Sequence, residues 1–429
     1  MYRYSIETRI LENKQEVILG NRRNGEWIKT TNEIVEFVDE YLKCPDHELR
    51  DFFDSFSKED EIYLLSIIEV LKKIDIIVAD DDDSDFKLDI ENVLISLTAR
   101  CNLTCKHCSM SATSFKNIDK LSYEDITRII DQLAHLKVRK VTLTGGEPLI
   151  RNDFFEIIKY IKENTPISIG IMTNATLINE KNIDELVKYS DSLDISIDGV
   201  NEDTCSVIRG KGVFNRVISA VKMLKDRKYK NIALSMTETP NNAPFVDRFY
   251  DLCRELDVFP AVREFEYIGR AVENKEDLSK VYSTNLIPNS KSEISINVIN
   301  NEAEMKKNGS RIKMGRCGAL RKSLSINENG FIFPCSLLNK DEDILGSIFD
   351  IDLRRLFVFE NITELASYKK LEKLEEYPNN ACSECNVKYF CLTCPHVIEM
   401  TNNDKTLGKN NFCNGRKEHF TNIVWGNNY

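Results

Sequence analysis

The sequence predicts an α/β protein whose centre is a partial, TIM-like (β/α)6 barrel, with a small unit before it and a cysteine-rich region after it. Three observations carry this prediction. From Val93 onward, short apolar segments alternate with longer amphipathic ones, which is typical of parallel βαβ units. The alternation repeats six times, so an open barrel fits better than a closed eightfold one. Ten of the 13 cysteines fall in two regions of the chain.

Length and charge exclude several classes of function. The chain has 429 residues and a formal net charge of −11, from 58 Lys and Arg against 69 Asp and Glu, so binding to nucleic acid is not its expected activity. No apolar run approaches the roughly 20 residues of a membrane helix, and the start lacks a secretory pattern. We therefore expect a cytoplasmic protein without a membrane partner, in which clustered thiols indicate metal rather than disulfides.

The first segment, residues 1–78, predicts a unit of three strands followed by three helices. Thr31 or Asn32 can cap the first helix, Asp46 the second and Ser57 the third, which we expect to end in Ile74, Ile76 and Ile77. An acidic stretch, residues 79–91, follows, and we interpret it as a solvated linker in preference to a cation site. The expected strands are Tyr4 to Ile10, Glu16 to Gly20 and Glu26 to Lys29.

The core is predicted over residues 92–300, and the irregular region with most of the cysteines over residues 301–429. The expected strands are Val93 to Leu97, Lys140 to Thr144, Ile167 to Met172, Leu193 to Ile197, Ile232 to Met236 and Ala261 to Tyr267. The expected helices lie near Tyr123 to Leu136, Phe154 to Glu163, Glu180 to Tyr189, Asn215 to Arg227 and Pro244 to Leu256.

A three-cysteine motif directly follows the first core strand. Cys101, Cys105 and Cys108 are separated by three and two residues, on a loop that meets the mouth of the barrel. Three thiolates suit a [4Fe–4S] cluster with one iron left free of protein ligands. The alternative is zinc, although structural zinc usually takes four protein ligands and His107 fits better as a packing neighbour than as the fourth.

A second motif, Thr144-Gly145-Gly146-Glu147-Pro148-Leu149, ends the second strand. Paired glycines allow close backbone approach to a ligand, and by itself this could be an ordinary turn. Together with the three-cysteine loop, about forty residues earlier, it resembles the radical S-adenosylmethionine (SAM) superfamily. The resemblance covers roughly residues 92 to 272. Further matches are Thr173-Asn174, Ser196-Ile197-Asp198-Gly199, Arg209-Gly210 and Gly269-Arg270-Ala271.

This resemblance implies an enzyme in which SAM binds the open iron through its amino and carboxylate groups and is cleaved to a 5′-deoxyadenosyl radical, which removes a substrate hydrogen. It also implies that Cys101, Cys105 and Cys108 hold the catalytic cluster and that Gly145, Gly146 and Glu147 meet the methionyl amine. Ser196 and Arg209 are candidates for the ribose or carboxylate, and structural roles for both remain open.

The second cysteine region contains seven cysteines, one fewer than two fully ligated four-iron clusters require. Their order resembles the SPASM extension of radical SAM enzymes, although two residues rather than three separate the fifth from the sixth. The resemblance implies three [4Fe–4S] clusters in all, and a compact zinc site is the alternative. The implied ligands are Cys382, Cys385, Cys391 and Cys413 for a distal cluster, and Cys317, Cys335 and Cys394 for a nearer one.

The first unit, with its winged-helix-like order, resembles the PqqD-like recognition element of enzymes that mature ribosomally made peptides. This implies that a leader peptide adds as a strand beside Gly25 to Thr30 and packs on Glu59 to Lys73. The alternative is a structural cap or a dimerisation domain.

Taken together, the sequence predicts a radical SAM/SPASM oxidoreductase that modifies a ribosomally made precursor peptide. We favour joining a cysteine sulfur to a carbon, because a nearer cluster with one missing ligand could hold the acceptor thiolate. The alternatives are carbon–carbon cross-linking, cyclophane formation, epimerisation or decarboxylative cyclisation of a peptide, a sulfatase-maturase-like enzyme, and a non-catalytic zinc adaptor. The expected partners are the precursor peptide and an electron donor such as flavodoxin or ferredoxin.

Overall fold

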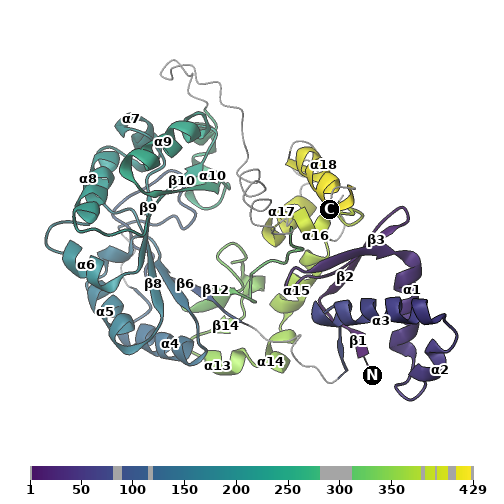
Figure 1. The fold of residues 1–429 in the computed structure, drawn as a ribbon. Helices are drawn as coiled ribbons and strands as arrows, with labels where there is room; N and C mark the ends of the chain where they lie inside the picture. The colour runs from purple at the N-terminus through teal and green to yellow at the C-terminus, as the bar shows by residue number, and fades with distance from the viewer. Residues whose placement is uncertain are drawn as a thin grey trace. The chain divides into compact units, whose positions relative to one another are not determined.

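The computed structural model describes residues 2–80, 89–114, 119–280, 312–377, 382–391, 394–403 and 412–426, without the side chains of 264, 359–360, 400–403 and 412–416. The predicted linker thus lies mostly outside the described residues. The chain divides into two compact units, coloured along the sequence in Figure 1. Unit 1 comprises Met1–Lys87, Ser295–Gly318 and Lys369–Tyr429, and unit 2 comprises Leu88–Ile294 and Ala319–Tyr368.

Unit 2 is an α/β fold around a nine-stranded, mostly parallel sheet. Its order is β11-β10-β9-β8-β7-β6-β12-β13-β14, so six consecutive strands lie side by side in chain order, all parallel. The strands are β6 (Asn92–Ser96), β7 (Lys140–Thr144), β8 (Ser168–Thr173), β9 (Ser192–Ser196), β10 (Ile232–Glu238), β11 (Phe259–Glu264), β12 (Ser323–Ile326), β13 (Phe331–Phe333) and β14 (Gly346–Ser347).

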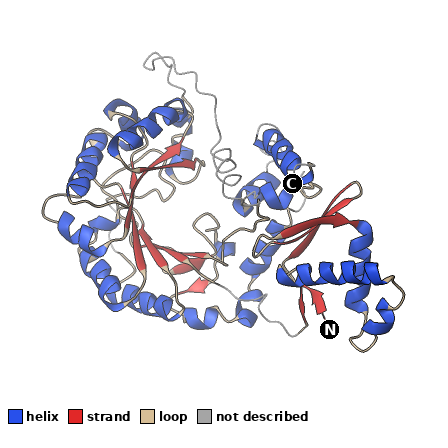
Figure 2. Cartoon of the chain, viewed as in Figure 1, coloured by secondary structure: helices blue, strands red, loops and turns tan. Residues whose placement is uncertain are grey.

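Helices cover the outer face of this sheet, as Figure 2 shows. Alternate strand residues such as Val141 and Leu143 are fully buried under them, while their neighbours face the concave side. Ser122 begins the first helix with a capping box to Asp125. The helices are α4 (Tyr123–His135), α5 (Phe154–Asn164), α6 (Ile183–Tyr189), α7 (Glu202–Arg209), α8 (Val213–Asp226), α9 (Val246–Leu256), α10 (Arg270–Glu273), α11 (Lys275–Leu278), α13 (Leu353–Leu356) and α14 (Phe359–Thr363), with 3-10 turns at Pro148–Ile150, Ala243–Phe245 and Asp341–Asp343.

The six predicted core strands are present in the predicted order: five lie within about two residues of the predicted bounds, and the sixth is shifted further. The sixth strand was expected at Ala261 to Tyr267 but is Phe259–Glu264, because it pairs with β10 from Phe259 onward. Pro260, the second residue of this strand, has no N–H to donate to a neighbouring strand. Since β11 is the edge of the sheet, a residue without an N–H is tolerated there.

Unit 2 also contains elements that the sequence does not predict. Helix α7 precedes the predicted helix near Asn215 and ends beside the cysteine loop at Arg209. Residues 323–347 were expected to be irregular, yet they add β12 parallel to β6 and then two antiparallel strands. These strands are two to four residues long, too short for a period-2 pattern to reveal them.

The first part of unit 1 contains the three predicted helices and a three-stranded antiparallel sheet, β2-β3-β4. The first expected strand is interrupted, because Tyr2–Tyr4 pairs with Ile77–Ala79. The prediction that the third helix ends in Ile76 and Ile77 is therefore wrong, since Ile77 begins a strand. Asp75, with φ of 56°, ends that helix. The elements are β1 (Tyr2–Tyr4), β2 (Thr8–Asn13), β3 (Glu16–Asn21), β4 (Trp27–Thr31), α1 (Asn32–Lys43), α2 (Leu49–Phe53), α3 (Lys58–Lys73) and β5 (Ile77–Ala79).

The last part of unit 1 is helical. The first part of unit 1 has an apolar core of its own. Leu19, Phe37 and Ile68 belong to one buried cluster beneath α1 and α3. Within the described ranges, no helix is long and apolar enough to cross a membrane. The later helices are α15 (Ala366–Glu375), α16 (Lys388–Cys391), α17 (Pro395–Asn403) and α18 (Phe412–Trp425).

Candidate functional site

The three-cysteine loop leaves the carboxyl end of β6, at the same edge of the sheet as the loops after β7, β8 and β9. Cys101 and Cys105 are buried and Cys108 is half-buried. Burial raises the pKa of the Cys101 thiol to about 11 and also raises the pKa of Cys105. These thiols therefore need a bound cation to ionise at neutral pH, as metal ligands do.

Each of the three sulfurs accepts hydrogen bonds from the surrounding chain. Cys101 Sγ accepts from the backbone N–H of Leu103 at 3.4 Å and from Asn174 Nδ2 at 3.8 Å. Cys108 Sγ accepts from the N–H of Ala112 at 3.4 Å, and Cys105 Sγ from Arg209 Nη1 at 3.9 Å. Donors of this kind stabilise anionic sulfur and tune the potential of iron–sulfur clusters.

The paired glycines after β7 lie against the chain that leads into the cysteine loop. The N–H of Gly146 donates to Thr98 O at 2.7 Å, and that of Glu147 to Arg100 O at 2.8 Å. A Cβ on Gly145 would lie 2.4 Å from Thr98 O, and one on Gly146 2.1 Å from Arg100 O. The sequence predicts that these glycines allow a ligand to approach the backbone closely. In the structure they contact the segment that leads to Cys101.

Gly146→Ala is accordingly expected to distort the cysteine loop. The added methyl group must displace Arg100 O, at a cost of about 1–3 kcal/mol for overpacking, and iron bound per chain after reconstitution should fall by more than half. Gly212→Ala is the matched control. It strains a residue with φ of 78° but meets only the Arg216 side chain at 3.5 Å, so it should keep its iron. Equal iron contents in the two variants would contradict this role of Gly146.

Glu147 is fully buried and tied to the end of β8. Its carboxylate accepts from Thr173 Oγ1 at 2.7 Å, from the N–H of Asn174 at 2.8 Å and from that of Leu149 at 3.2 Å. Burial, partly offset by these donors, raises its pKa to about 6. A carboxylate has about four acceptor positions, so one remains for the predicted ammonium contact.

Asp198, which follows β9, joins two residues next to the cysteine loop. Its Oδ2 lies 2.6 Å from Arg209 Nε and 2.5 Å from His107 Nε2, and its Oδ1 accepts from the N–H of Thr237 at 2.6 Å. Although burial alone would raise it, Arg209 and then His107 hold the pKa of Asp198 well below its ordinary value. Arg209, a predicted SAM contact, is thus engaged by Asp198 and Cys105.

Arg270, in the Gly269-Arg270-Ala271 match, holds the far side of the loop. Its N–H donates to Cys108 O at 3.0 Å, and its Nη1 donates to Cys105 O at 2.9 Å. Gly269, with φ of 58°, approaches Ser109 so closely that a Cβ would lie 2.2 Å from Ser109 O. The sequence motif gave this position but not its role, because the contact joins residues about 160 apart.

The remaining predicted residues are distributed over both units. Ser196 is half-buried at the end of β9, with its Oγ 3.5 Å from Ser235 Oγ. Cys335 belongs to unit 2 and lines the concave side of its sheet. The other cysteines of the second region belong to unit 1, and the side chain of Cys413 lies outside the described structure. Those described in unit 1 are Cys317, Cys382, Cys385, Cys391 and Cys394.

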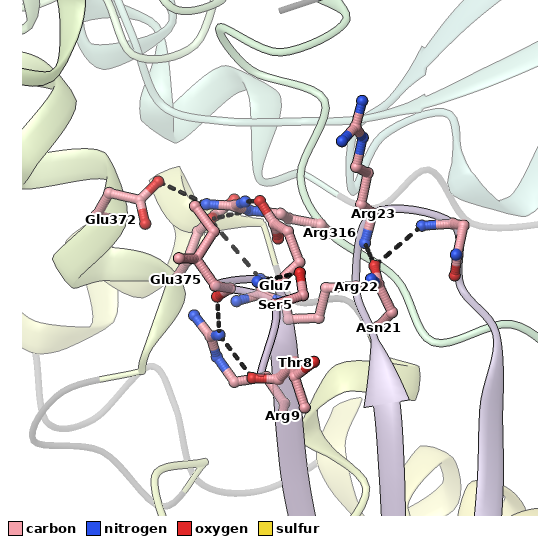
Figure 3. A network of polar contacts seen from close by, with 12 residues as sticks. Ser5, Glu7, Thr8, Arg9, Asn21, Arg22, Arg23, Arg316, Glu372 and Glu375 are labelled. Carbon is pink, nitrogen blue, oxygen red and sulfur yellow. Dashed lines mark hydrogen bonds and ion pairs between the residues drawn. The ribbon is translucent and has the colours of Figure 1, made fainter. Parts of the chain in front are cut away.

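A buried ion network within unit 1, which the sequence did not predict, joins the first part of the chain to the residue before Cys317 (Figure 3). Arg316, only 9% exposed, pairs with Glu7, with Glu372 at 2.5 Å and with Glu375 at 3.0 Å. We call these four residues the Arg316 network. Arg22 joins it through Glu375 at 3.7 Å.

Aromatic contacts extend this junction towards Cys391. The guanidinium of Arg22 lies 4.7 Å from the centre of the Tyr389 ring, and Trp27 meets Phe390 edge-on with ring centres 5.3 Å apart. The N–H of Gly315 donates to Tyr389 O at 2.8 Å. The backbone that carries two predicted cluster ligands, Cys317 and Cys391, is therefore fixed on the N-terminal sheet.

The residues of the cysteine loop fit an iron–sulfur cluster. One loop supplies three sulfurs, each faced by an N–H donor, and Arg209 places a positive charge beside Cys105. Within the described residues, no group of three or more Cys, His, Asp or Glu is arranged to hold a single metal ion.

Comparisons with known proteins agree with this arrangement. Residues 95–243 match the family model "Radical SAM superfamily". The mycofactocin maturase MftC of Mycolicibacterium smegmatis is 25% identical over 297 residues, covering 67% of this chain and 74% of MftC.

Two solved structures share the fold. SuiB of Streptococcus suis bound to S-adenosylmethionine has a TM-score of 0.54 at 16% identity, over 96% of this chain and 99% of SuiB, and SuiB has also been solved with its precursor peptide SuiA. The structure of anSMEcpe with AdoMet and a Cp18Cys peptide has a TM-score of 0.54 at 19% identity, over 78% of this chain and 96% of that one. The chain thus contains a radical SAM domain and has mycofactocin maturases among its relatives.

Proposed function

We infer that this chain, which contains a radical SAM domain, is an enzyme that modifies a ribosomally made precursor peptide. Cys101, Cys105 and Cys108 would hold a [4Fe–4S] cluster, and SAM bound beside it would supply a 5′-deoxyadenosyl radical. The loops after β7 and β9 would position the cofactor at this edge of the sheet, with Glu147 offering its remaining acceptor position. The relatedness to MftC supports a peptide as the substrate.

The open space inside the half-barrel is the main structural support for a peptide substrate. A pocket of about 630 Å³ lies on the concave face of the sheet, lined by the inward residues of β6 to β11 and by Cys335. This volume is within the range of small-ligand sites. In a closed (β/α)8 barrel, branched apolar side chains fill the same space, so an open lumen, lined by both apolar and polar side chains, favours a substrate there.

Within this class we propose the formation of a sulfur-to-carbon thioether. In this reaction the peptide would lose a hydrogen atom from carbon, a proton from the thiol and one electron. Bound SAM would supply the radical that takes the hydrogen atom, and an acceptor of the iron–sulfur class would take the electron. The net change is the loss of two hydrogens. Cys335 supports this proposal, because it brings one sulfur of the cysteine-rich region to the wall of the same pocket. The nearer and distal auxiliary clusters, and therefore a total of three [4Fe–4S] clusters, are likewise proposed.

The N-terminal part of unit 1 is proposed to bind the leader peptide. β4 is an edge strand of its sheet, so it can accept a further strand. Helix α3 exposes two large side chains, Ile62 at 68% and Tyr63 at 59%, which could pack on an apolar leader. The N–H of Met314 donates to Gly25 O at 2.9 Å, just before β4 begins. Among the described residues, Ile28 to Thr31 have no strand on their outer side.

Co-expression with a short precursor peptide encoded beside the gene tests the proposed reaction. Mass spectrometry should find a peptide that has lost two hydrogens and resists alkylation at the modified cysteine. Cys335→Ala should abolish this product while keeping 5′-deoxyadenosine formation within about tenfold of wild type, because the residue is not in the cysteine loop. Ser336→Ala, a neighbour that lines the same pocket, is the matched control and should keep the product. An unchanged mass with deuterium uptake would show that the enzyme epimerises the peptide and does not cross-link it.

A further inference from the structure

The two faces of the central sheet differ in chemistry. The outward residues of the strands are apolar, as with Ile169 and Ile195, which are buried under the helices. Several inward residues are polar or small, and three are charged. The inward residues that line the pocket include Asn92, Leu94, Lys140, Thr142, Gly170, Met172, Ser192, Asp194, Ala233, Phe259 and Arg263.

The three charged residues leave one positive charge unpaired. Arg263, at the end of β11, forms an ion pair with Asp194 of β9. Lys140 begins β7 and has no acidic side chain within ion-pair distance among the described residues. The formal charges of these three side chains, one carboxylate and two cations, sum to +1.

The Lys140 side chain is directed across the neighbouring strand by a glycine. A Cβ on Gly170 would lie 2.8 Å from Lys140 Cε and 3.2 Å from its Nζ. Ser192 Oγ lies 3.2 Å from the same point, on the next strand. The absence of a side chain at Gly170 therefore makes room for the ammonium group on the pocket wall, next to a hydroxyl that can also donate a hydrogen bond.

We propose that Lys140 binds a carboxylate of the substrate inside the half-barrel. This rests on the proposed function, in which the substrate is a peptide. In an unmodified peptide, carboxylates are the only groups that are largely anionic at neutral pH. The pKa values of Asp, Glu and the chain end lie near 4 or below, whereas that of a free cysteine lies near 8.5. The peptide region that enters the lumen would then carry an acidic side chain or the C-terminus. A hydrogen bond to the hydroxyl of Ser192 can share the same carboxylate.

Ligand-observed NMR on the reconstituted protein, with saturating SAM to fill the cofactor site, tests this assignment. Three probes separate the two sources of the carboxylate: N-acetylglutamate α-amide carries it on a side chain, N-acetylalanine carries it at a chain end, and N-acetylglutamine amide carries none. At least one acid should bind wild type about tenfold or more tightly than the uncharged amide. A hydrogen bond to a charged group typically increases affinity by a factor of this size. The tighter acid identifies the source.

Lys140→Gln should reduce the binding of that acid to the level of the uncharged amide. Lys159→Gln, which removes an exposed lysine from the outer helix α5, is the matched control and should bind like wild type. Wild type that does not distinguish acids from the amide, or Lys140→Gln that binds the acid unchanged, would overturn the proposal. Because the readout is binding, this failure is distinct from a failure of the proposed function, which would appear as an unmodified co-expressed peptide.

Discussion

Cys105→Ala is expected to abolish the formation of 5′-deoxyadenosine. Cys105 is buried at the centre of the loop, where its sulfur faces Arg209 and its carbonyl oxygen accepts from Arg270. Removing it leaves two thiolates where three would hold the cluster. Mutating a residue that only contacts a metal ligand typically lowers metal affinity or activity about 10–100-fold. Loss of a ligand itself should therefore lower turnover more than about a hundredfold. Anaerobic reconstitution followed by chromatography of the nucleoside product measures this loss.

Cys253→Ala is the matched control for this substitution. Cys253 is also a fully buried cysteine, but it lies in α9 on the outer layer, where burial raises its pKa to about 12. It should behave as a small apolar side chain, so the variant should lose some stability and keep its nucleoside product. If Cys105→Ala still cleaved SAM at the rate of this control, the role assigned to the loop would be wrong.

Arg316→Ala is expected to give the largest loss of stability among single substitutions in unit 1. The variant leaves Glu7 and Glu375, 6% and 2% exposed, without the cation that they share. Removing one partner from a buried ionic network typically costs about 3–5 kcal/mol, because the remaining charges stay buried. Chemical denaturation measures the change. Arg248→Ala, which breaks an exposed pair with Glu255, should cost less than about 1 kcal/mol.

The Arg316 network also bears on how the N-terminal part of the chain can be tested. Deleting residues 1–78 would remove Glu7 and Arg22 together with any leader-binding surface, and so would disturb Arg316, the residue before Cys317. Iron content measured on Arg316→Ala separates the two effects. Loss of iron beyond that of the Arg248→Ala control would indicate that the network positions the cysteine-rich segments. Full retention would limit its role to stability.

The sequence was sufficient to predict elements with strong periodicity and motifs with fixed spacing. The six parallel strands lie in the predicted order because each apolar segment is long enough to show its pattern. The helices between them each bury one apolar face, as with Ile126, Ile130 and Leu133 of α4. The radical SAM motifs gave the three-cysteine loop and the Gly145-Gly146 edge. Short strands such as β13 and β14 gave no such pattern, and only their pairing reveals them.

Contacts between distant residues could not be predicted in this way. Glu147 and Arg209 were assigned to SAM from their motifs, yet their nearest partners are protein groups at Thr173, Asn174 and Asp198. Lys140 appeared in the sequence only as the first residue of an apolar strand. Its significance depends on Gly170 in the next strand, and on the Asp194 carboxylate that pairs with a different cation.

We propose that Cys101, Cys105 and Cys108 hold a cluster in which one iron is free of protein ligands and binds SAM. Electron–nuclear double resonance on the reduced wild-type protein, with SAM labelled with ¹⁵N at its amino group, tests it most directly. We expect wild type to show a hyperfine coupling from the label and Cys105→Ala to show none. A reduced cluster without any coupling to the labelled nitrogen would contradict it.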